Sequence, residues 1–415
     1  MFLGLNIEKP LVLTKFKNKM NHLKRWLYRV KNIRMKYLVY ISTFLMFPLT
    51  NGQEASKSVM IESTAEKEQV VVPIITTPSQ QYMGRKYYTS QKDIWKQKIE
   101  LNQTDANAWF NYYQALRYEN YTGISSISSQ KAEELASVVS KMSKLIPTSF
   151  EYNLTNYING NNNPALFSFL QKAYKLNSNH PEVLKQLVAY YEITGNSSKR
   201  NEHLNSLNSI NRYAEGISNY NFNVIKSIEK NGVILTNGEN DTYPLWLAQN
   251  KEKRPDITIV NLELMLDKNY QQNVFSKLGI NSPYMANSSS VFNKILSGTN
   301  KQAYVGLSVN KTYLKSKVKD LYLVGLVFKF SKTKIENLKL LDELWNKKLN
   351  TSYLSKPVNN TASRQMNKNY LMPLITLRNY YKNTGNLVES KKKEALILKL
   401  AKEAGIEQTV KPQLK

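Results

Sequence analysis

The residues best suited to chemistry lie in one short acidic turn. The string Asn237-Gly-Glu-Asn-Asp241 brings two carboxylates and two side-chain amides together, and Arg254 follows shortly after it. Such carboxylates could bind a cation or a hydroxyl-rich ligand, and a guanidinium could pair with a carboxylate or a phosphate. The simpler interpretation is structural, because Asn237-Gly238 makes a turn, Asp241 caps the next helix and Arg254 ties down the following turn. The candidate ligand-binding residues are Asn237, Glu239, Asn240, Asp241 and Arg254.

The composition of this turn argues against two familiar kinds of site. A phosphate-binding loop is rich in glycine, whereas this turn has one glycine and two carboxylates that would repel phosphate. A glycosidase places its two carboxyl groups on opposite sides of the bond that it cleaves, but Glu239 and Asp241 are neighbours and no partner acid is identifiable. Nucleotide binding is therefore disfavoured, no residue is assigned as catalytic, and no cofactor is expected.

The elements that must position this turn are a strand, a helix and a second strand. Residues 233–235 form a short apolar run that Asn237-Gly238 ends, and Asp241-Thr242 before Tyr243-Pro244 predicts the start of a helix. Residues 256–262 return as a β-branched run. The unit is therefore a predicted βαβ crossover. Its polar turn lies at the carboxyl end of the first strand, where open α/β sheets usually bind ligands.

These residues also carry a resemblance. The string from Thr236 to Leu247, with Arg254-Pro-Asp-Ile and Gly325-Leu-Val-Phe-Lys-Phe further on, resembles the soluble C-terminal region of bacterial membrane proteins related to protein O-mannosyltransferases. The resemblance covers about residues 220–330, and similar soluble regions occur beside tetratricopeptide-like helices. In that family a multi-spanning membrane half carries the glycosyl transfer, and the 415 residues contain no such half. The resemblance implies a fold and a compartment, and it leaves catalysis open.

The use of cysteine and histidine excludes several kinds of chemistry. The chain has no cysteine, which rules out disulfides, thiolate nucleophiles, zinc-thiolate sites and lipoprotein attachment. Its three histidines, His22, His180 and His203, show no metal-ligand spacing, and none lies in the α/β segment. We therefore expect no metal site and no Ser-His-Asp triad.

The net charge of +27 is spread over the chain except for a basic beginning. Residues 1–36 hold ten Lys or Arg against the single acid Glu8, and the densest later cluster is Lys391-Lys-Lys393. No Arg-rich stripe with interleaved aromatic residues is present. This distribution disfavours nucleic acid as a partner and fits contact with anionic membrane or glycan surfaces.

Residues 35–52 have the three parts of a secretory signal. Met35-Lys36 precede a charge-free run at 37–49, and Thr50-Asn-Gly52 supplies small residues at the cleavage site. The apolar run is short for a membrane span, which needs about 20 residues. We expect translation to start at Met35, the mature chain to begin near Gln53, and the protein to be periplasmic or secreted. An uncleaved N-terminal anchor is the alternative.

Apolar residues at helical spacing surround the α/β segment on both sides. Residues 172–184 resemble the junction between two helices of a tetratricopeptide repeat, and a tyrosine pair followed by Gly-Asn occurs with the same spacing at 190–196 and 380–386. We interpret these tyrosines as packing residues rather than as a carbohydrate platform. The predicted fold class is mainly α with an inserted α/β unit, in which helical-repeat hairpins flank a small βαβ, Rossmann-like sheet.

The predicted organisation has five parts: a signal sequence at 1–52, a linker at 53–89, a helical-repeat domain at 90–212, the α/β unit at 213–330 and a C-terminal helical-repeat region at 331–415. Within the linker, the apolar island at 70–75 is a candidate docking strand. Within the α/β unit, 303–309 and 321–330 are each expected to be one strand.

Two classes of function follow from these features. The first is a non-catalytic binding or scaffold protein of the cell envelope, whose partner is an envelope protein or a glycan. The second is an accessory subunit or enzyme of envelope glycan or protein glycosylation that uses the turn at Glu239 and Asp241. We favour the first, because helical repeats more often bind peptides or proteins than small molecules.

Overall fold

The computed structural model describes residues 75, 83–120 and 127–414. Contacts along the chain divide it into two compact units, and the second, Asn51–Lys415, holds all of the described residues. The expected signal sequence at Met35–Gly52 and most of the expected linker at 53–89 lie outside the described residues. Ile75 of the apolar island is buried, and its backbone N–H donates to the Asn111 side-chain oxygen at 3.1 Å.

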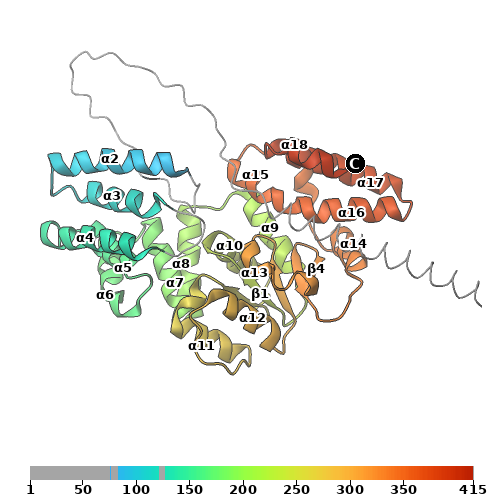
Figure 1. The fold of residues 1–415 in the computed structure, drawn as a ribbon, viewed down its shortest axis with the longest axis horizontal. Coiled ribbons are helices and arrows are strands. Elements are labelled where there is room, and N and C mark those ends of the chain that lie inside the picture. Colours follow the sequence, from blue (N-terminus) through green and yellow to red (C-terminus); the bar gives the residue numbers. More distant parts are fainter. Residues whose placement is uncertain (1–74, 76–82, 121–126, 415) are drawn as a thin grey trace, which may run out of the picture. The chain divides into compact units, whose positions relative to one another are not determined.

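The described chain is mainly helical and contains one small mixed sheet (Figure 1). The helices that precede the sheet are α2 (Arg85–Leu101), α3 (Ala106–Tyr118), α4 (Ser129–Leu145), α5 (Phe150–Asn159), α6 (Phe167–Leu176), α7 (Pro181–Ile193), α8 (Ser197–Ile210) and α9 (Glu215–Lys226). The helices between its strands are α10 (Glu239–Lys251), α11 (Lys268–Lys277), α12 (Ser288–Gly298) and α13 (Lys311–Leu314). Those that follow it are α14 (Asn337–Lys347), α15 (Thr361–Asn367), α16 (Leu371–Asn383), α17 (Leu387–Glu403) and α18 (Glu407–Val410).

Local sequence signals explain where several of these helices begin. The carboxylate of Asp105 accepts from the Ala108 N–H and so caps α3. Ser128 caps α4 and Asp267 caps α11 in the same way. Helix α2 begins at Arg85, inside the expected linker. Apolar side chains from α2 to α7, among them Trp95, pack into one continuous core.

Five strands of the described chain form the sheet, in the order β2-β1-β3-β5-β4. They are β1 (Val233–Thr236), β2 (Thr258–Asn261), β3 (Ala303–Gly306), β4 (Leu321–Val324) and β5 (Val327–Phe330). Strand β1 pairs in parallel with both β2 and β3, with Val233 opposite Thr258 on one side and Ala303 on the other. Because α10 connects β1 to β2, the predicted βαβ crossover is confirmed. All residues of β1 and β3 are buried, as central strands covered on both faces require.

The strand predicted at 321–330 is wrong, because the chain makes an antiparallel hairpin there. Strands β4 and β5 pair across a two-residue turn, Gly325-Leu326. Gly325 has a φ of +56°, and a Cβ at this position would lie 2.2 Å from the Ser227 hydroxyl oxygen. The Ser227 hydroxyl also accepts from the Leu326 N–H at 3.0 Å. A glycine at the first central position is what a type II′ turn demands, so the residue expected to extend the strand reverses it.

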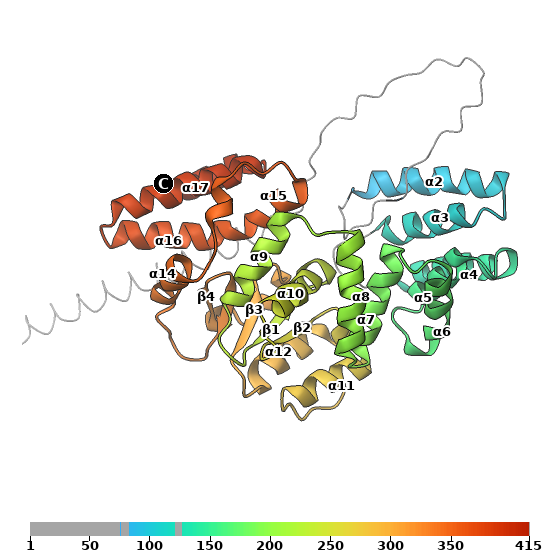
Figure 2. The same cartoon turned by 180° about the vertical axis from the view of Figure 1, so that it is seen from behind.

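The helices after the sheet contact α9, which precedes it. Helix α9 packs against α10 and α15 (Figure 2). The amide of Asn223 donates to the Asn350 carbonyl at 2.8 Å and to the Tyr370 hydroxyl at 2.9 Å, and it accepts from the Asn350 N–H at 2.8 Å. Asn223 is fully buried. The residues before the sheet are thereby joined to residues well after it.

The two tyrosine-pair segments form turns of one geometry. Gly195 and Gly385 have φ values of +77° and +82°. The following asparagines, Asn196 and Asn386, cap α8 and α17 through their side-chain oxygens. Tyr381 is buried, whereas Tyr190 is half-buried and stacks on Phe167 with ring centroids 3.7 Å apart. The tyrosines therefore pack against neighbouring side chains, as interpreted from the sequence.

No helix in the described part of the chain is long and apolar enough to span a bilayer.

Candidate functional site

The acidic turn becomes the first turn of α10, so the predicted role of Asp241 as its N-cap is wrong. Helix α10 begins at Glu239, and Gly238 occupies the capping position without a side chain. The Gly238 carbonyl accepts from the N–H groups of Asp241 and Thr242 at 3.2 and 3.0 Å and from the Thr242 hydroxyl at 2.8 Å. Glu239 and Asp241 therefore lie inside the helix, where the positive end of the helix dipole favours carboxylates.

Threonine hydroxyls anchor this turn to the sheet. The hydroxyls of Thr236, at the end of β1, and Thr242 lie 2.7 Å apart, and Thr236 donates to the Val260 carbonyl of β2 at 3.1 Å. Both threonines are buried. The start of α10 is thereby held at the carboxyl edge of the sheet, as predicted, with Asn240 exposed and Asn237 partly exposed.

Glu239 is joined to the helical region before the sheet. Its carboxylate lies 3.0 Å from the ammonium of Lys185 on α7, and Glu182 lies 3.9 Å from the same ammonium. The Tyr243 hydroxyl of α10 donates to the Lys185 carbonyl at 3.0 Å. Burial opposes the charge of Lys185, but Glu239 and Glu182 hold its pKa above the usual value. Glu239 is thus half of an ion pair that connects α7 to α10.

Asp241, Ser308 and Glu263 also lie at the carboxyl edge of the sheet. Burial raises the pKa of Asp241, while hydrogen bonds from Ser308, after β3, and from the Asn237 backbone oppose the rise. Glu263, after β2, is an exposed residue whose carboxylate lies beside Gly238; the loss of part of its hydration there raises its pKa, and repulsion from Asp241 and Glu239 raises it further, to about 7. The segments after β1 and β2 therefore supply an acidic cluster of Glu239, Asp241 and Glu263, and the segment after β3 adds the Ser308 hydroxyl.

Gly238 leaves room for the carboxylate of Glu263. A Cβ at position 238 would lie 2.6 and 2.7 Å from the two carboxylate oxygens of Glu263. A side chain at this position would push the Glu263 carboxylate aside, which the flexible end of an exposed side chain allows at low cost. The φ of −105° at Gly238 is open to all residues, so only this close approach favours a glycine here.

Arg254 lies at the opposite edge of the sheet from the acidic cluster. Its guanidinium pairs with Asp256 at 2.8 Å and donates to the carbonyls of Ile228 and Glu229, which precede β1. The Arg254 guanidinium in turn holds the pKa of the Asp256 carboxyl well below its usual range. Arg254 therefore tethers the turn before β2, as the simpler interpretation has it, and it shares no site with Glu239, Asn240 and Asp241.

One family matches part of this architecture. Residues 217–392 match the model of the TMEM260-associated domain 2. The matched segment begins within α9, contains the whole sheet and ends within α17. No curated protein has significant sequence similarity to the chain.

The TMEM260-associated domain 2 match overlaps the stretch that resembles O-mannosyltransferase-related proteins, and it extends past that stretch through α14, α15 and α16. This longer extent agrees with the contacts. Asn223 on α9 is hydrogen-bonded to Asn350, which follows α14, and to Tyr370, which precedes α16, so α9 is joined to residues beyond 330 that the match also covers.

Sequence reasoning missed Lys185, Glu263 and Ser308. Lys185 could have been found, because it is a lysine on the apolar face of a helix, between Leu184 and Val188. Ser308 falls inside the strand predicted at 303–309, whereas β3 ends at Gly306 and Ser308 follows it at the same edge as Asp241. Glu263 gave a weaker signal, because the distance between strand ends depends on the order of the strands in the sheet.

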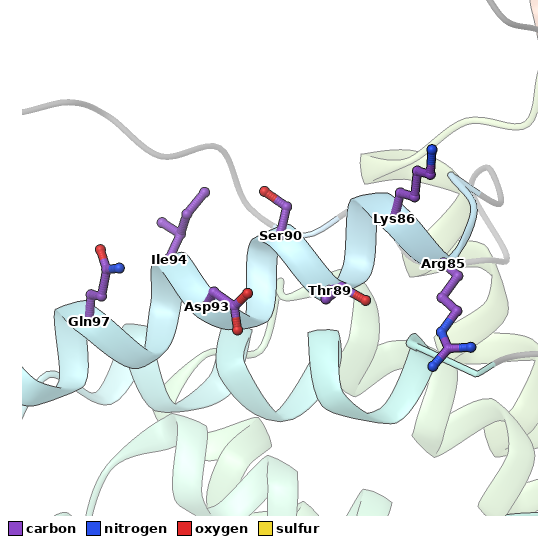
Figure 3. Close-up of a pocket in the computed structure, with 7 residues that line it drawn as sticks. All are labelled: Arg85, Lys86, Thr89, Ser90, Asp93, Ile94 and Gln97. Carbon is purple, nitrogen blue, oxygen red and sulfur yellow. The ribbon is translucent and has the colours of Figure 1, made fainter.

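Two open depressions lie away from the acidic cluster. The first runs along the outer side of α2, which supplies all of its lining residues, and Lys86, Ser90 and Ile94 point the same way along it (Figure 3). The second lies at the amino edge of the sheet and is lined by Lys226, Lys230, Arg254 and Lys348 together with Glu229 and Asp256. Within the described residues, no three His, Cys, Asp or Glu side chains are arranged to hold a metal ion.

Proposed function

We propose that the protein is a non-catalytic binding module of the cell envelope, which takes a hydroxyl-rich ligand of the glycan class at the carboxyl edge of its sheet. The observation that carries this proposal is the strand order. Strand β1 lies between β2 and β3, so the chain leaves β1 and β3 toward opposite sides, and open α/β sheets usually bind ligands at the carboxyl ends of two such strands. Asn237, Asn240, Asp241 and Ser308 lie at that point.

The chemistry of the edge supports a neutral polar ligand. Amide, hydroxyl and carboxylate groups bind sugar hydroxyls as donors and acceptors. Three carboxylates would repel phosphate, and Glu239 is already paired with Lys185. The partial match to the TMEM260-associated domain 2 and the resemblance to O-mannosyltransferase-related proteins support a place beside glycan transfer.

The helices on both sides of the sheet support a scaffold role. The α7–α8 and α16–α17 hairpins share one turn geometry, in keeping with tetratricopeptide-like hairpins that flank a Rossmann-like unit. An envelope protein is the partner that such helices would bind. The signal pattern at 35–52 supports export to the periplasm or beyond, and intact mass of the protein from an envelope fraction tests this by showing a chain that begins near Gln53.

Ligand binding is tested by titrating the purified full-length protein with neutral oligosaccharides in a calorimeter. Asp241→Asn keeps the size of the side chain and removes its charge, so we expect loss of affinity with little loss of stability. Glu252→Gln, at the far end of α10, is the matched control. Equal affinities in wild type, Asp241→Asn and the control would contradict a glycan site at this edge.

The second candidate function is an accessory enzyme of glycosylation. It is favoured by the pKa of Glu263, which at about 7 is in the range that a general acid needs. Glu239 is less suited to this role, because it is paired with Lys185. Sugar release from a synthetic glycoside that is abolished in Glu263→Gln, but kept in Glu239→Gln, would support the enzyme. Absence of sugar release by the wild-type protein would contradict the enzyme and favour the non-catalytic binding module.

A further inference from the structure

The molecule contains the same helix–turn–helix junction twice, and the two copies differ in what covers them. In both, the N–H of the capping asparagine donates to the second tyrosine's carbonyl, Asn196 to Tyr191 at 2.8 Å and Asn386 to Tyr381 at 2.9 Å. The α7–α8 turn touches α11, because Asn273 donates to the Ile193 carbonyl at 3.0 Å. At the α16–α17 turn, no described atom lies within 4 Å of the position a Gly385 Cβ would take.

The uncovered turn presents the more apolar residues. The two positions after the capping asparagine are Ser197-Ser198 in the covered turn and Leu387-Val388 in the uncovered one. Leu387 is 59% exposed and Val388 is 66% exposed. They are the one adjacent pair among the exposed large hydrophobic residues of the described chain. Since Ser-Ser serves the same turn geometry, the apolar pair is not needed to form the turn.

Exposed lysines lie close to this apolar tip in the sequence. Residues 382–393 contain four lysines, Lys382, Lys391, Lys392 and Lys393, against the single acid Glu389. Lys393 is buried over the rings of Trp345 and Tyr381, and both it and Lys392 pair with Glu389, at 3.3 and 2.7 Å. Lys382, Lys391 and Lys392 are exposed. An exposed apolar pair with exposed positive charges near it is complementary to a surface that is negative outside and apolar beneath.

We propose that the α16–α17 turn is a membrane-docking tip, which inserts Leu387 and Val388 into the interface of an anionic lipid bilayer. The size of the tip favours a bilayer over a protein. A specific protein interface needs at least about 1,000 Å² of buried surface, whereas two side chains and a few lysines suffice for reversible binding to a bilayer. Each lysine near an anionic membrane surface contributes about 1 kcal/mol, which is about fivefold in partition.

Co-sedimentation of the full-length protein with lipid vesicles tests the proposal. We expect binding to phosphatidylcholine mixed with phosphatidylglycerol, weaker binding to phosphatidylcholine alone, and a decrease with added salt. The double variant Leu387→Ser, Val388→Ser copies the covered turn, so it should fold and lose about tenfold or more in partition. Leu176→Ser removes a lone exposed leucine and should bind as wild type does. Undiminished binding by the double variant would overturn the proposal.

Because the chain has no cysteine, a fluorophore can be attached at a single introduced cysteine. Its signal then reports on that position alone, even if another segment of the protein also binds the membrane. Val388→Cys carries an environment-sensitive fluorophore at the tip, and Ser198→Cys carries it at the matching position of the covered turn. We expect the emission to shift to the blue on addition of anionic vesicles for position 388 and to stay unchanged for position 198. Equal responses at the two positions would overturn the proposal. Sedimentation velocity without lipid is a further check. A wild-type dimer that becomes a monomer in the double variant Leu387→Ser, Val388→Ser would also overturn the proposal, because the tip would then join two copies of the protein.

Discussion

Glu263 lies beside Asp241 and Glu239 at the carboxyl edge, and its folded-state pKa of about 7 stands above the usual 4.5. Because the folded protein binds this proton more tightly than the unfolded chain does, the proton stabilises the fold. That stability is fully present below about pH 4.5 and is lost as the pH rises through 7. We therefore expect Glu263→Gln to raise the unfolding temperature at pH 8 and to change it little at pH 4.

Calorimetric unfolding at the two pH values checks this expectation. Glu133→Gln, which changes an exposed glutamate on α4, is the matched control and should show no such difference between pH 4 and pH 8. A Glu263→Gln variant whose unfolding temperature differs from wild type by the same amount at both pH values would show that folding does not raise the pKa of Glu263.

Tyr381 is buried at the end of α16, where its hydroxyl donates to Asp342 and accepts from the Asn346 amide, both on α14. Removing the ring in Tyr381→Ala should cost about 3 to 5 kcal/mol of unfolding free energy, because a large cavity is left. Tyr381→Phe keeps the ring and should cost about 1 kcal/mol for the lost hydrogen bonds. Chemical denaturation measures both values. Tyr190→Ala, which changes the half-buried counterpart, should cost less, and the reverse order would contradict the packing described.

At the scale of elements, the periodicity of apolar residues predicted strands and helices but not the turns between or before them. Strands β1 and β2 and the helix between them follow from apolar runs and breakers. The β4–β5 hairpin did not follow, because Gly-Leu is a weaker turn signal than Asn-Gly and the apolar residues continue on both sides. The start of α10 was predicted too late for a similar reason. The Asp241-Thr242 pair resembles an N-cap, but the helix already begins at Glu239, where the Gly238 carbonyl accepts the first hydrogen bonds of the helix.

The two edges of the sheet also show what a linear pattern lacks. The sequence placed Asn237, Glu239, Asn240 and Asp241 at the carboxyl end of a strand, and the structure agrees. The predicted crossover also implied that Arg254, which precedes the second of two parallel strands, returns to the amino edge, so Arg254 should not have been grouped with these residues. Lys185 reaches the same edge from a separate helix, and only tertiary packing decides such a contact.

Gly325 provides a prediction for the β4–β5 hairpin. Gly325→Ala combines a positive φ with a clash against Ser227, so we expect a loss of about 2 to 4 kcal/mol of stability. Gly279→Ala is the matched control, because Gly279 also has a positive φ, of +65°, but open space around it, and it should lose about 1 kcal/mol. Urea denaturation of both variants measures the difference. Equal losses would mean that Ser227 moves aside freely.

At the scale of the whole molecule, buried polar contacts join the helices after the sheet to α9 before it. Asn223 is the centre of this connection, with three hydrogen bonds to Asn350 and Tyr370. Asn223→Ala removes one hydrogen bond to the buried Tyr370 hydroxyl and two to the partly buried backbone of Asn350, so we expect a loss of about 3 kcal/mol of unfolding free energy. Asn211→Ala, at an exposed helix end, is the control. A small loss for Asn223→Ala, measured by thermal unfolding, would show that these three hydrogen bonds do not hold α9 to the later helices.

The same connection sets the order in which the protein can fold. The partners of Asn223 lie 127 and 147 residues further along the chain. A ribosome adds about 5 to 20 residues per second, so α9 waits roughly ten seconds for them. During that interval α15 has not yet been made, so the face of α9 that later packs against α15 is exposed to solvent. Because such non-local pairings form late, α9 and the helices around it complete their folding only after the chain has been made past Tyr370.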